Sequence, residues 1–234
     1  MSEPQTLAQV LAGNTYPGRG IVVGLTPDGT RAALAYFIMG RSANSRNRVF
    51  AQRDGDVWTQ PADPSQVQDP SLIIYRALAQ AGTATVLTNG DQTDTIVAAL
   101  ADGGSFESAL RTREYEPDAP NFTSRISALV EPRPSGLVYR LSQLRCWQAT
   151  TQRFFWECEG VPGRGHLIHT YAGDGDPLPP FAGSPREVAT ADHQDIWTHA
   201  CWEALNADNR ISLLTRYIPL GGGAPVTQII NKYE

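Results

Sequence analysis

The sequence lacks a long hydrophobic run. Its longest uninterrupted apolar stretch covers eight residues, from Ala32 to Met39, whereas a transmembrane helix needs about 20. A membrane-spanning helix is therefore excluded, and no membrane partner is expected. The first residues are polar and acidic, so they do not have the basic and then apolar order of a secretory signal. Together these absences favour a cytoplasmic protein.

Cysteine and charge are also scarce in this chain of 234 residues. Cys146, Cys158 and Cys201 are far apart and form no Cys-x-x-Cys pair, so neither a zinc knuckle nor a redox dithiol is indicated. Charged residues make up only 18%, too few for a disordered acidic tail or a coiled coil. We expect an ordinary globular chain with buried free thiols.

Lysine is nearly absent. The nineteen basic residues include a single lysine, Lys232, and the formal net charge is −5. A net negative charge argues against a broad binding face for duplex nucleic acid, so no nucleic-acid partner is expected. Arginine suits phosphate recognition, although a coding bias explains the arginine count more simply.

What the sequence does contain is a succession of short strand-like segments. Residues 20–39 predict a β-hairpin about the turn Pro27-Asp28-Gly29, and residues 49–59 predict another about Asp54-Gly55. Strands run together instead of alternating singly with helices, which favours an α+β fold of one domain. The remaining predicted strands cover residues 83–88, 123–131, 137–147, 152–159 and 211–218.

Helices are predicted where capping patterns precede apolar residues. Asp69-Pro70 combines a capping carboxylate with a proline at the first helical position. Ser184-Pro185-Arg186-Glu187 has the pattern of a capping box. Asn89-Gly90 is a strong turn signal in front of another helix. The predicted helices cover residues 70–82, 91–103, 105–113 and 184–205.

Two polar segments have the composition of a phosphate site. Residues 41–48 bring three guanidinium groups together with several amide and hydroxyl groups. Residues 88–95 lie between a strand end and a helix start, where free backbone N–H groups attract anions. A solvated turn and a well-capped connection are the alternative interpretations.

A third polar segment, residues 115–125, holds two carboxylates, Glu116 and Asp118, in a stretch that Pro117 and Pro120 make irregular. General acid or base catalysis needs a carboxylate that its surroundings hold in place. The segment therefore favours a catalytic loop, with an ordinary surface loop as the alternative.

Other catalytic patterns are missing. His166 and His169 are three residues apart, and on a strand they would face opposite sides, so no metal site is expected. The sequence has no Gly-x-Ser-x-Gly elbow, and its Gly-Arg-Gly segments lack the lysine and hydroxyl of a P-loop. Neither a covalent serine nucleophile nor a nucleoside triphosphate site is indicated.

Four segments together resemble one family. They are residues 16–24, the arginine segment 40–48, Asn89-Gly90 with Thr93-Asp94-Thr95, and Tyr115-Glu116 with Asn121 and Arg125-Ile126. In this order and spacing they are similar to the archaeal-type inosine monophosphate (IMP) cyclohydrolases. The resemblance implies a four-layer αββα sandwich like that of N-terminal nucleophile (Ntn) hydrolases, without autocatalytic processing. Residues 16–234 would form this single domain, after an extension of residues 1–15.

The resemblance also implies an activity. The protein would close formamidoimidazole carboxamide ribonucleotide (FAICAR) to IMP with loss of water, as a cyclohydrolase in de novo purine biosynthesis that needs no cofactor. Arg48, or Arg46 if the register shifts, would stabilise charge on the formyl oxygen. Glu116 would take a proton from the carboxamide nitrogen and Tyr75 would deliver one to the leaving hydroxyl, or the roles would be exchanged. The residues implied to bind the purine-precursor ribonucleotide are Arg41, Asn47, Asn89, Gly90, Thr93, Asp94, Tyr115, Asn121, Thr123 and Arg125.

Some features depart from the family pattern. Fifteen residues precede Tyr16, so a free N-terminal nucleophile at the sheet edge is not expected. The arginine segment holds extra residues, and residues 138–180 do not match. These departures leave open a relative that acts on another imidazole or C-nucleoside ring, and a catalytically silent purine nucleotide sensor. The sequence also leaves open whether the chain forms a homo-oligomer.

Overall fold

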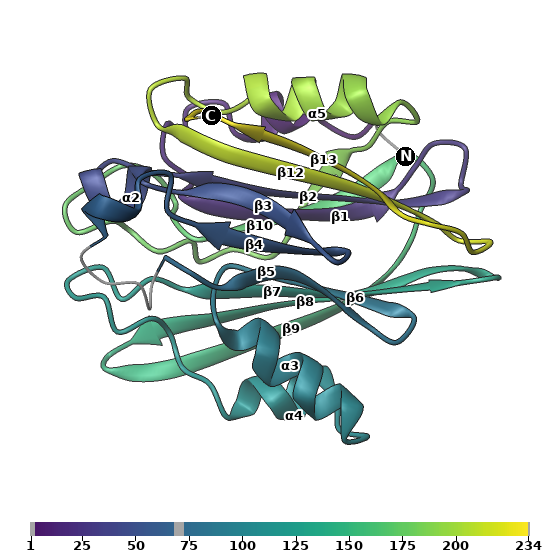
Figure 1. Ribbon diagram of the computed structural model, residues 1–234, viewed down its shortest axis with the longest axis horizontal. Coiled ribbons are helices and arrows are strands. Elements are labelled where there is room, and N and C mark those ends of the chain that lie inside the picture. The colour runs from purple at the N-terminus through teal and green to yellow at the C-terminus, as the bar shows by residue number, and fades with distance from the viewer. Residues whose placement is uncertain (1–2, 68–72, 234) are drawn as a thin grey trace.

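The computed structural model describes residues 3–67 and 73–233. Within these ranges thirteen strands form two antiparallel sheets that lie face to face. Figure 1 shows helix α5 over one sheet and helices α3 and α4 over the other. The layers therefore run helix, sheet, sheet, helix, in agreement with the α+β sandwich expected from the sequence.

The first sheet is built around the predicted hairpin. Its two central strands are buried on both faces because one face packs on the second sheet and the other on helices. Ile21 and Val23 point into the core between the sheets, whereas Val22 points toward α1 and α5. In spatial order the strands are β11 (Arg186–Ala189), β10 (Arg164–His169), β1 (Arg19–Leu25), β2 (Arg31–Met39), β12 (Arg210–Pro219) and β13 (Val226–Asn231).

The second sheet follows the chain without a crossover. Each strand pairs with the next one in sequence, so most of its connections are short turns. The strands are β3 (Val49–Arg53), β4 (Asp56–Gln60), β5 (Arg76–Ala81), β6 (Ala84–Thr88), β7 (Arg125–Arg133), β8 (Gly136–Trp147) and β9 (Thr150–Glu159).

The helices cover the outer faces of the sheets. Trp197 and Cys201 of α5 pack on the first sheet together with Leu7 of α1, and Ile96 and Phe106 of α3 and α4 pack on the second. No helix in the described ranges is long and apolar enough to cross a bilayer. The helices are α1 (Leu7–Val10), α2 (Ala43–Arg46), the 3₁₀ turn η1 (Pro64–Gln66), α3 (Gln92–Ala101), α4 (Phe106–Arg111) and α5 (Gln194–Glu203).

Two predicted helices are wrong over part of their length. The segment expected to be helical up to Gly82 forms strand β5, because Leu78 pairs with Val57 of β4 and with Leu87 of β6. Asp69-Pro70 lies outside the described residues. The capping box at Ser184 also starts no helix. Instead, Arg186–Ala189 adds to the first sheet as an edge strand, and the helix begins only at Gln194. In both cases strand pairing overrode a local helix signal.

Candidate functional site

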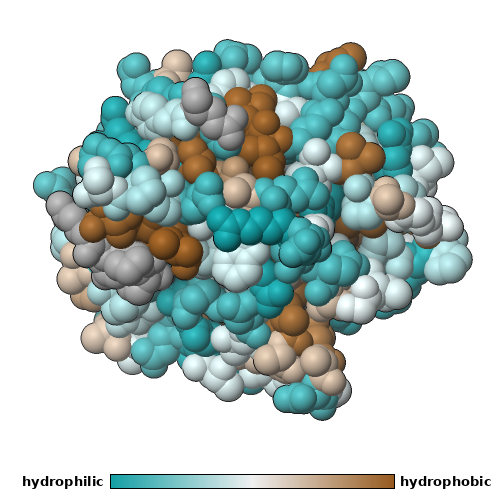
Figure 2. Space-filling view, viewed as in Figure 1, coloured by the Kyte–Doolittle hydropathy of each residue, from teal (hydrophilic) through white to brown (hydrophobic). Residues whose placement is uncertain are grey.

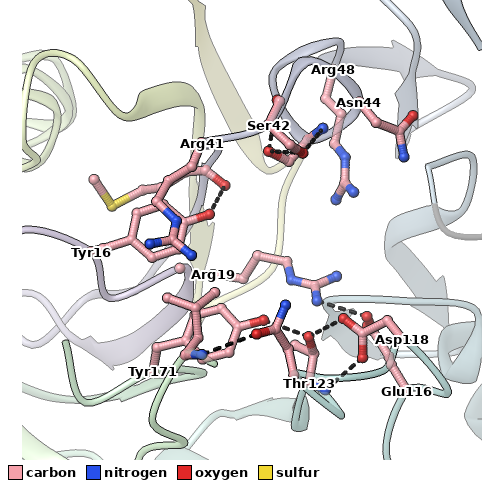
Figure 3. A pocket seen from close by; sticks show the side chains of 15 residues that line it. Tyr16, Arg19, Arg41, Ser42, Asn44, Arg48, Glu116, Asp118, Thr123 and Tyr171 are labelled. Atoms are coloured by element: carbon pink, nitrogen blue, oxygen red, sulfur yellow. Dashed lines mark hydrogen bonds and ion pairs between the residues drawn. The ribbon is translucent and has the colours of Figure 1, made fainter. Parts of the chain in front are cut away.

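A polar cavity of about 280 Å³ opens at one end of the sandwich. The start of β1 and the end of β2 meet there, because neighbouring antiparallel strands begin and end at the same edge. The loop of residues 112–124, which leads into β7, forms the opposite wall. Three segments distant in sequence therefore contribute side chains to one cavity, as Figure 3 shows.

Arg19 and Glu116 form a buried ion pair in the cavity wall. The Arg19 guanidinium lies 2.7 Å from the Glu116 carboxylate and also donates a hydrogen bond to the Asn89 carbonyl at 3.1 Å. Burial lowers the pKa of Arg19, but the neighbouring carboxylate and the nearby tyrosine hydroxyls together outweigh that effect and leave the pKa raised well above its usual value. A fixed cation therefore orients the carboxylate at the cavity.

Arg48 faces this pair from the other side of the cavity (Figure 3). Its backbone is fixed just before β3, where its carbonyl accepts a hydrogen bond from Ser212 at 3.2 Å. The residue is only 8% exposed, and its buried Nε has no hydrogen-bond partner. Among the described residues the guanidinium makes no ion pair. Because a buried charge is normally paired, Arg48 is a cation prepared for an anionic or carbonyl oxygen.

Aromatic rings form the wall next to Arg41. The Arg41 guanidinium lies 5.1 Å from the centre of the Tyr16 ring and forms an ion pair with Asp174, while Tyr16 stacks on Tyr171 at 5.9 Å. Gly18 permits this close packing, because a Cβ there would lie 2.4 Å from the Tyr171 ring. Burial raises the pKa of Tyr16, and raises that of Tyr171 to about 12. Both phenols are therefore protonated at neutral pH.

Hydrogen bonds make the loop of residues 112–124 a defined structure. The Thr123 hydroxyl bonds both the Asp118 carboxylate and the Tyr171 hydroxyl, and the Thr123 backbone N–H donates to Asp118 at 2.7 Å. The Glu116 backbone N–H donates to the Thr123 carbonyl at 2.9 Å. Asn121 accepts from the Leu178 backbone at 3.0 Å. This network holds Glu116 in place across the cavity from Arg48.

The structure brings together only part of the residue set proposed from the sequence. Those that line the cavity are Arg41, Arg48, Glu116, Asn121 and Thr123. These come from two of the three polar segments, so the expected convergence of an arginine loop with a later carboxylate is present in the structure.

Three of the other proposed residues do not line the cavity. Arg46 donates to the Gly40 carbonyl at 3.2 Å, and together with Asn47 it lines a separate surface hollow. The Asn47 side chain bonds the backbone of Asp63. Tyr75 is buried, and its hydroxyl lies 2.6 Å from that of Tyr36.

The turn of residues 89–94 lies behind Glu116 instead of lining the cavity. Asn89 is fully buried and its side-chain carbonyl accepts from the Ile126 N–H at 2.9 Å. Arg125 forms an ion pair with Asp91 at 2.7 Å. The remaining residues proposed from the sequence also contact protein groups and do not line the cavity. They are Gly90, Thr93 and Asp94 of the turn, and Tyr115. The turn therefore packs behind the loop of residues 112–124 and does not line the cavity.

Sequence reasoning missed several residues that line the cavity. Arg19 and Tyr16 lie within a segment that carried the family resemblance, yet nothing local distinguished them from packing residues. Tyr171 belongs to residues 138–180, which lie outside the four segments that carry the resemblance. Its one available signal is Gly18, because a glycine lets another group approach the backbone closely, and here that group is the Tyr171 ring. Asp118 is one of the two carboxylates of the third polar segment, and the sequence assigns it no separate role.

The two histidines of β10 face opposite sides, as the strand period predicts. The Tyr139 hydroxyl lies 2.6 Å from His166 Nδ1 between the sheets, whereas His169 Nδ1 donates to the Tyr171 carbonyl at 2.9 Å on the opposite face. Burial lowers the pKa of His169 to about 4. His169 is therefore neutral in the folded protein under ordinary conditions.

His169 makes stability depend on pH. As pH falls below about 6.5 the unfolded chain binds a proton at this residue while the folded chain does not, so stability is lost toward pH 4. Between pH 7 and pH 4.5 we expect urea denaturation to show about 2 kcal/mol less loss in His169→Gln than in the wild type. His199→Gln alters an exposed histidine and should change nothing. An equal pH dependence in His169→Gln and the wild type would contradict this assignment.

Comparisons with known proteins agree with the geometry. A family model described as IMP cyclohydrolase-like protein matches residues 16–222. A protein from Methanopyrus kandleri named IMP cyclohydrolase is 30% identical over 160 residues, which cover 67% of this chain and 75% of the relative. The family match includes residues 138–180, which the sequence segments alone had left unassigned. The chain belongs to the IMP cyclohydrolase-like family.

Proposed function

We propose that this protein is an IMP cyclohydrolase that closes FAICAR to IMP with loss of water in purine biosynthesis, and that the cavity is its active site. The observation that carries the proposal is the Arg48 guanidinium, which makes no ion pair with any described residue and faces the buried Arg19–Glu116 pair in a chain of this family. Burying a cation without a counter-charge costs free energy, so an ordinary surface turn would not be expected to do it, whereas a functional site would.

The reaction sets clear demands on such a site. A carboxamide nitrogen attacks a formyl carbon of the same molecule, gives a tetrahedral hydroxy adduct and then loses water. An amide nitrogen is a poor nucleophile, so the protein must hold the formyl rotamer that faces it, and good orientation supplies up to about 7–11 kcal/mol. No electrons are transferred, so the proposal includes no cofactor.

The cavity residues can take the required roles. Arg48 stabilises the charge that develops on the formyl oxygen, an effect worth about 3–4 kcal/mol for comparable donors. Glu116, oriented by Arg19, accepts the carboxamide proton. Tyr16 and Tyr171 stay protonated and are the phenols at the cavity that can supply a proton to the leaving hydroxyl. They replace the buried Tyr75 in that role.

Residues on both walls of the cavity can bind the substrate. Arg41, Ser42 and Ser45 line the cavity, and a guanidinium with two hydroxyls is a donor set that suits the 5′-phosphate. Asn121 and Thr123, on the opposite wall, are placed for contacts to ribose or base. Arg46 and the turn of residues 89–94, which do not line the cavity, have no direct substrate contact in this proposal.

Broader expectations belong to the same proposal. The αββα layers suit an Ntn-hydrolase-like fold in which the cavity lies at the start of β1. Residues 16–234 act as one domain, with residues 1–15 as an extension whose helix α1 packs near α5. A cytoplasmic location fits a charged ribonucleotide substrate.

Ultraviolet absorbance tests this function directly. Purified protein is mixed with FAICAR, and the formation of IMP is followed against a sample without protein. We expect turnover well above the uncatalysed rate. Tight IMP binding without turnover would support a nucleotide sensor instead, and turnover of a different imidazole ribonucleotide alone would support a relative with another substrate.

A further inference from the structure

Strand β9 leaves a long edge of the second sheet unpaired. At ten residues it is the longest of the four edge strands within the described ranges. It contains neither lysine nor proline, the residues with which edge strands usually avoid pairing, and its centre is Phe154-Phe155-Trp156. Figure 1 shows β9 at the border of the lower sheet, beyond β8, and Figure 2 shows apolar side chains exposed among polar ones on the same view of the molecule. Such an edge is a template for another strand.

The turn before β9 decides which backbone groups face outward. Gln148 and Ala149 have φ values of 48° and 60°, as in a two-residue type I′ turn, so Trp147 and Thr150 form a hydrogen-bonded pair. Hydrogen-bonded and non-hydrogen-bonded pairs alternate along the strand. The even-numbered residues of β9 therefore bond β8, and the outward groups belong to residues 151, 153, 155, 157 and 159.

We propose that β9 pairs antiparallel with β9 of a second copy of this chain, about a two-fold axis at Phe155. In this register Arg153 of each copy lies opposite Glu157 of the other, and Phe154 lies opposite Trp156. Residues 153, 155 and 157 all have outward backbone groups, so these pairs exchange N–H···O=C bonds across the axis. The two sheets join into one continuous sheet, and the contact is self-complementary.

Charge selects this register over its neighbours. An axis at Arg153 would place two guanidinium groups opposite each other, and an axis at Glu157 would do the same with two carboxylates. An axis at Trp156 would oppose Phe155 to Glu157. Like charges opposite each other are destabilising, whereas opposite charges and aromatic pairs stabilise a sheet. The sequence of residues 153–157, Arg-Phe-Phe-Trp-Glu, is therefore complementary to itself when two copies pair antiparallel about Phe155.

The surroundings of β9 agree with this contact. Arg153 donates to the carbonyls of Leu110 and Arg113, and Glu157 bonds Arg140 at 2.8 Å, which fixes both charges on the face that carries α4. The strand is also flanked by exposed apolar side chains. Trp147, before β9, is 52% exposed, and Val161, after it, is 44% exposed.

Apolar side chains beside the proposed contact would be covered in the dimer. Phe154 and Trp156 also border a shallow cavity of about 170 Å³ against residues 182–184, and the second copy would cover this apolar surface.

A charge swap on the full chain tests the proposal by sedimentation velocity over a concentration series. The wild type should sediment as a dimer of the 25.4 kDa chain. Glu157→Arg puts like charges opposite each other at both pairs and should raise the dimer dissociation constant at least about tenfold. The double variant Arg153→Glu/Glu157→Arg restores opposite charges and should restore the dimer. Glu159→Arg changes the same charge opposite Thr151 and should leave dimerisation within about threefold of wild type.

Hydrogen exchange on the wild-type protein gives a readout that needs no variant to fold. The amides of residues 153, 155 and 157 should exchange more slowly at concentrations where the dimer forms than where the chain is a monomer. A monomeric wild type at all concentrations would overturn the proposal. A dimer that tolerates Glu157→Arg, or one whose β9 amides are unaffected by concentration, would also overturn it.

Discussion

Arg48→Ala should lower kcat for FAICAR closure about 10²–10³-fold while leaving the fold intact. The loss follows because Arg48 supplies the unpaired guanidinium at the cavity, and the deletion of one preorganised donor to a developing oxyanion costs about that much. The side chain makes no ion pair among the described residues, so the substitution removes a buried charge without breaking an ion pair to a described residue. Steady-state kinetics and urea denaturation on the same sample measure both effects.

A neighbouring arginine provides the matched control. Arg46→Ala removes the same chemical group two residues away, but Arg46 lies at a different hollow and bonds Gly40. Its kcat should stay within about threefold of the wild type. Equal losses in the two variants, or a large loss only for Arg46→Ala, would mean that the register of the arginine segment assigns the wrong residue to the reaction.

Glu116→Gln should lose both stability and activity. The change leaves the Arg19 guanidinium buried without its counter-charge, and breaking a buried pair by removing one partner costs about 3–5 kcal/mol. The same change removes the proposed general base, worth about 10²–10⁴-fold in rate. Urea denaturation gives the first effect, and kinetics at a temperature where the variant is folded give the second.

An exposed carboxylate in the same loop separates these effects from a general loss of charge. Glu114→Gln alters an exposed residue two positions away and should change the free energy of unfolding by less than about 0.5 kcal/mol, with normal turnover. Wild-type turnover by folded Glu116→Gln would remove Glu116 from the chemistry while leaving its structural role with Arg19.

The sequence predicted those elements whose local signals agree with the tertiary structure. The β1–β2 hairpin and the helix after Asn89-Gly90 are confirmed, because turn residues there coincide with buried apolar runs. The segment before Gly82 failed because Leu78 sits at a spacing that suits a helix or a strand, and only the neighbours β4 and β6 decide between them. No property of residues 76–81 alone contains that information.

In the site, too, residues in segments of distinctive composition could be predicted, whereas residues whose role depends on tertiary contacts could not. Arg41, Arg48 and Glu116 were proposed from segments rich in donors and carboxylates, and the structure brings them to one cavity. Arg19 and Tyr171 could not be found this way. One is a charge at the start of a strand and the other a tyrosine after β10, and their importance arises only from the partners that the fold brings to them.

A structure of the protein in complex with IMP tests the central claim most directly. The account predicts the purine ring between Arg48 and Glu116, with the Arg48 guanidinium within hydrogen-bond distance of the product and the phosphate near Arg41. A nucleotide bound in another hollow, with the Arg48 side chain still unpaired in the cavity, would contradict it.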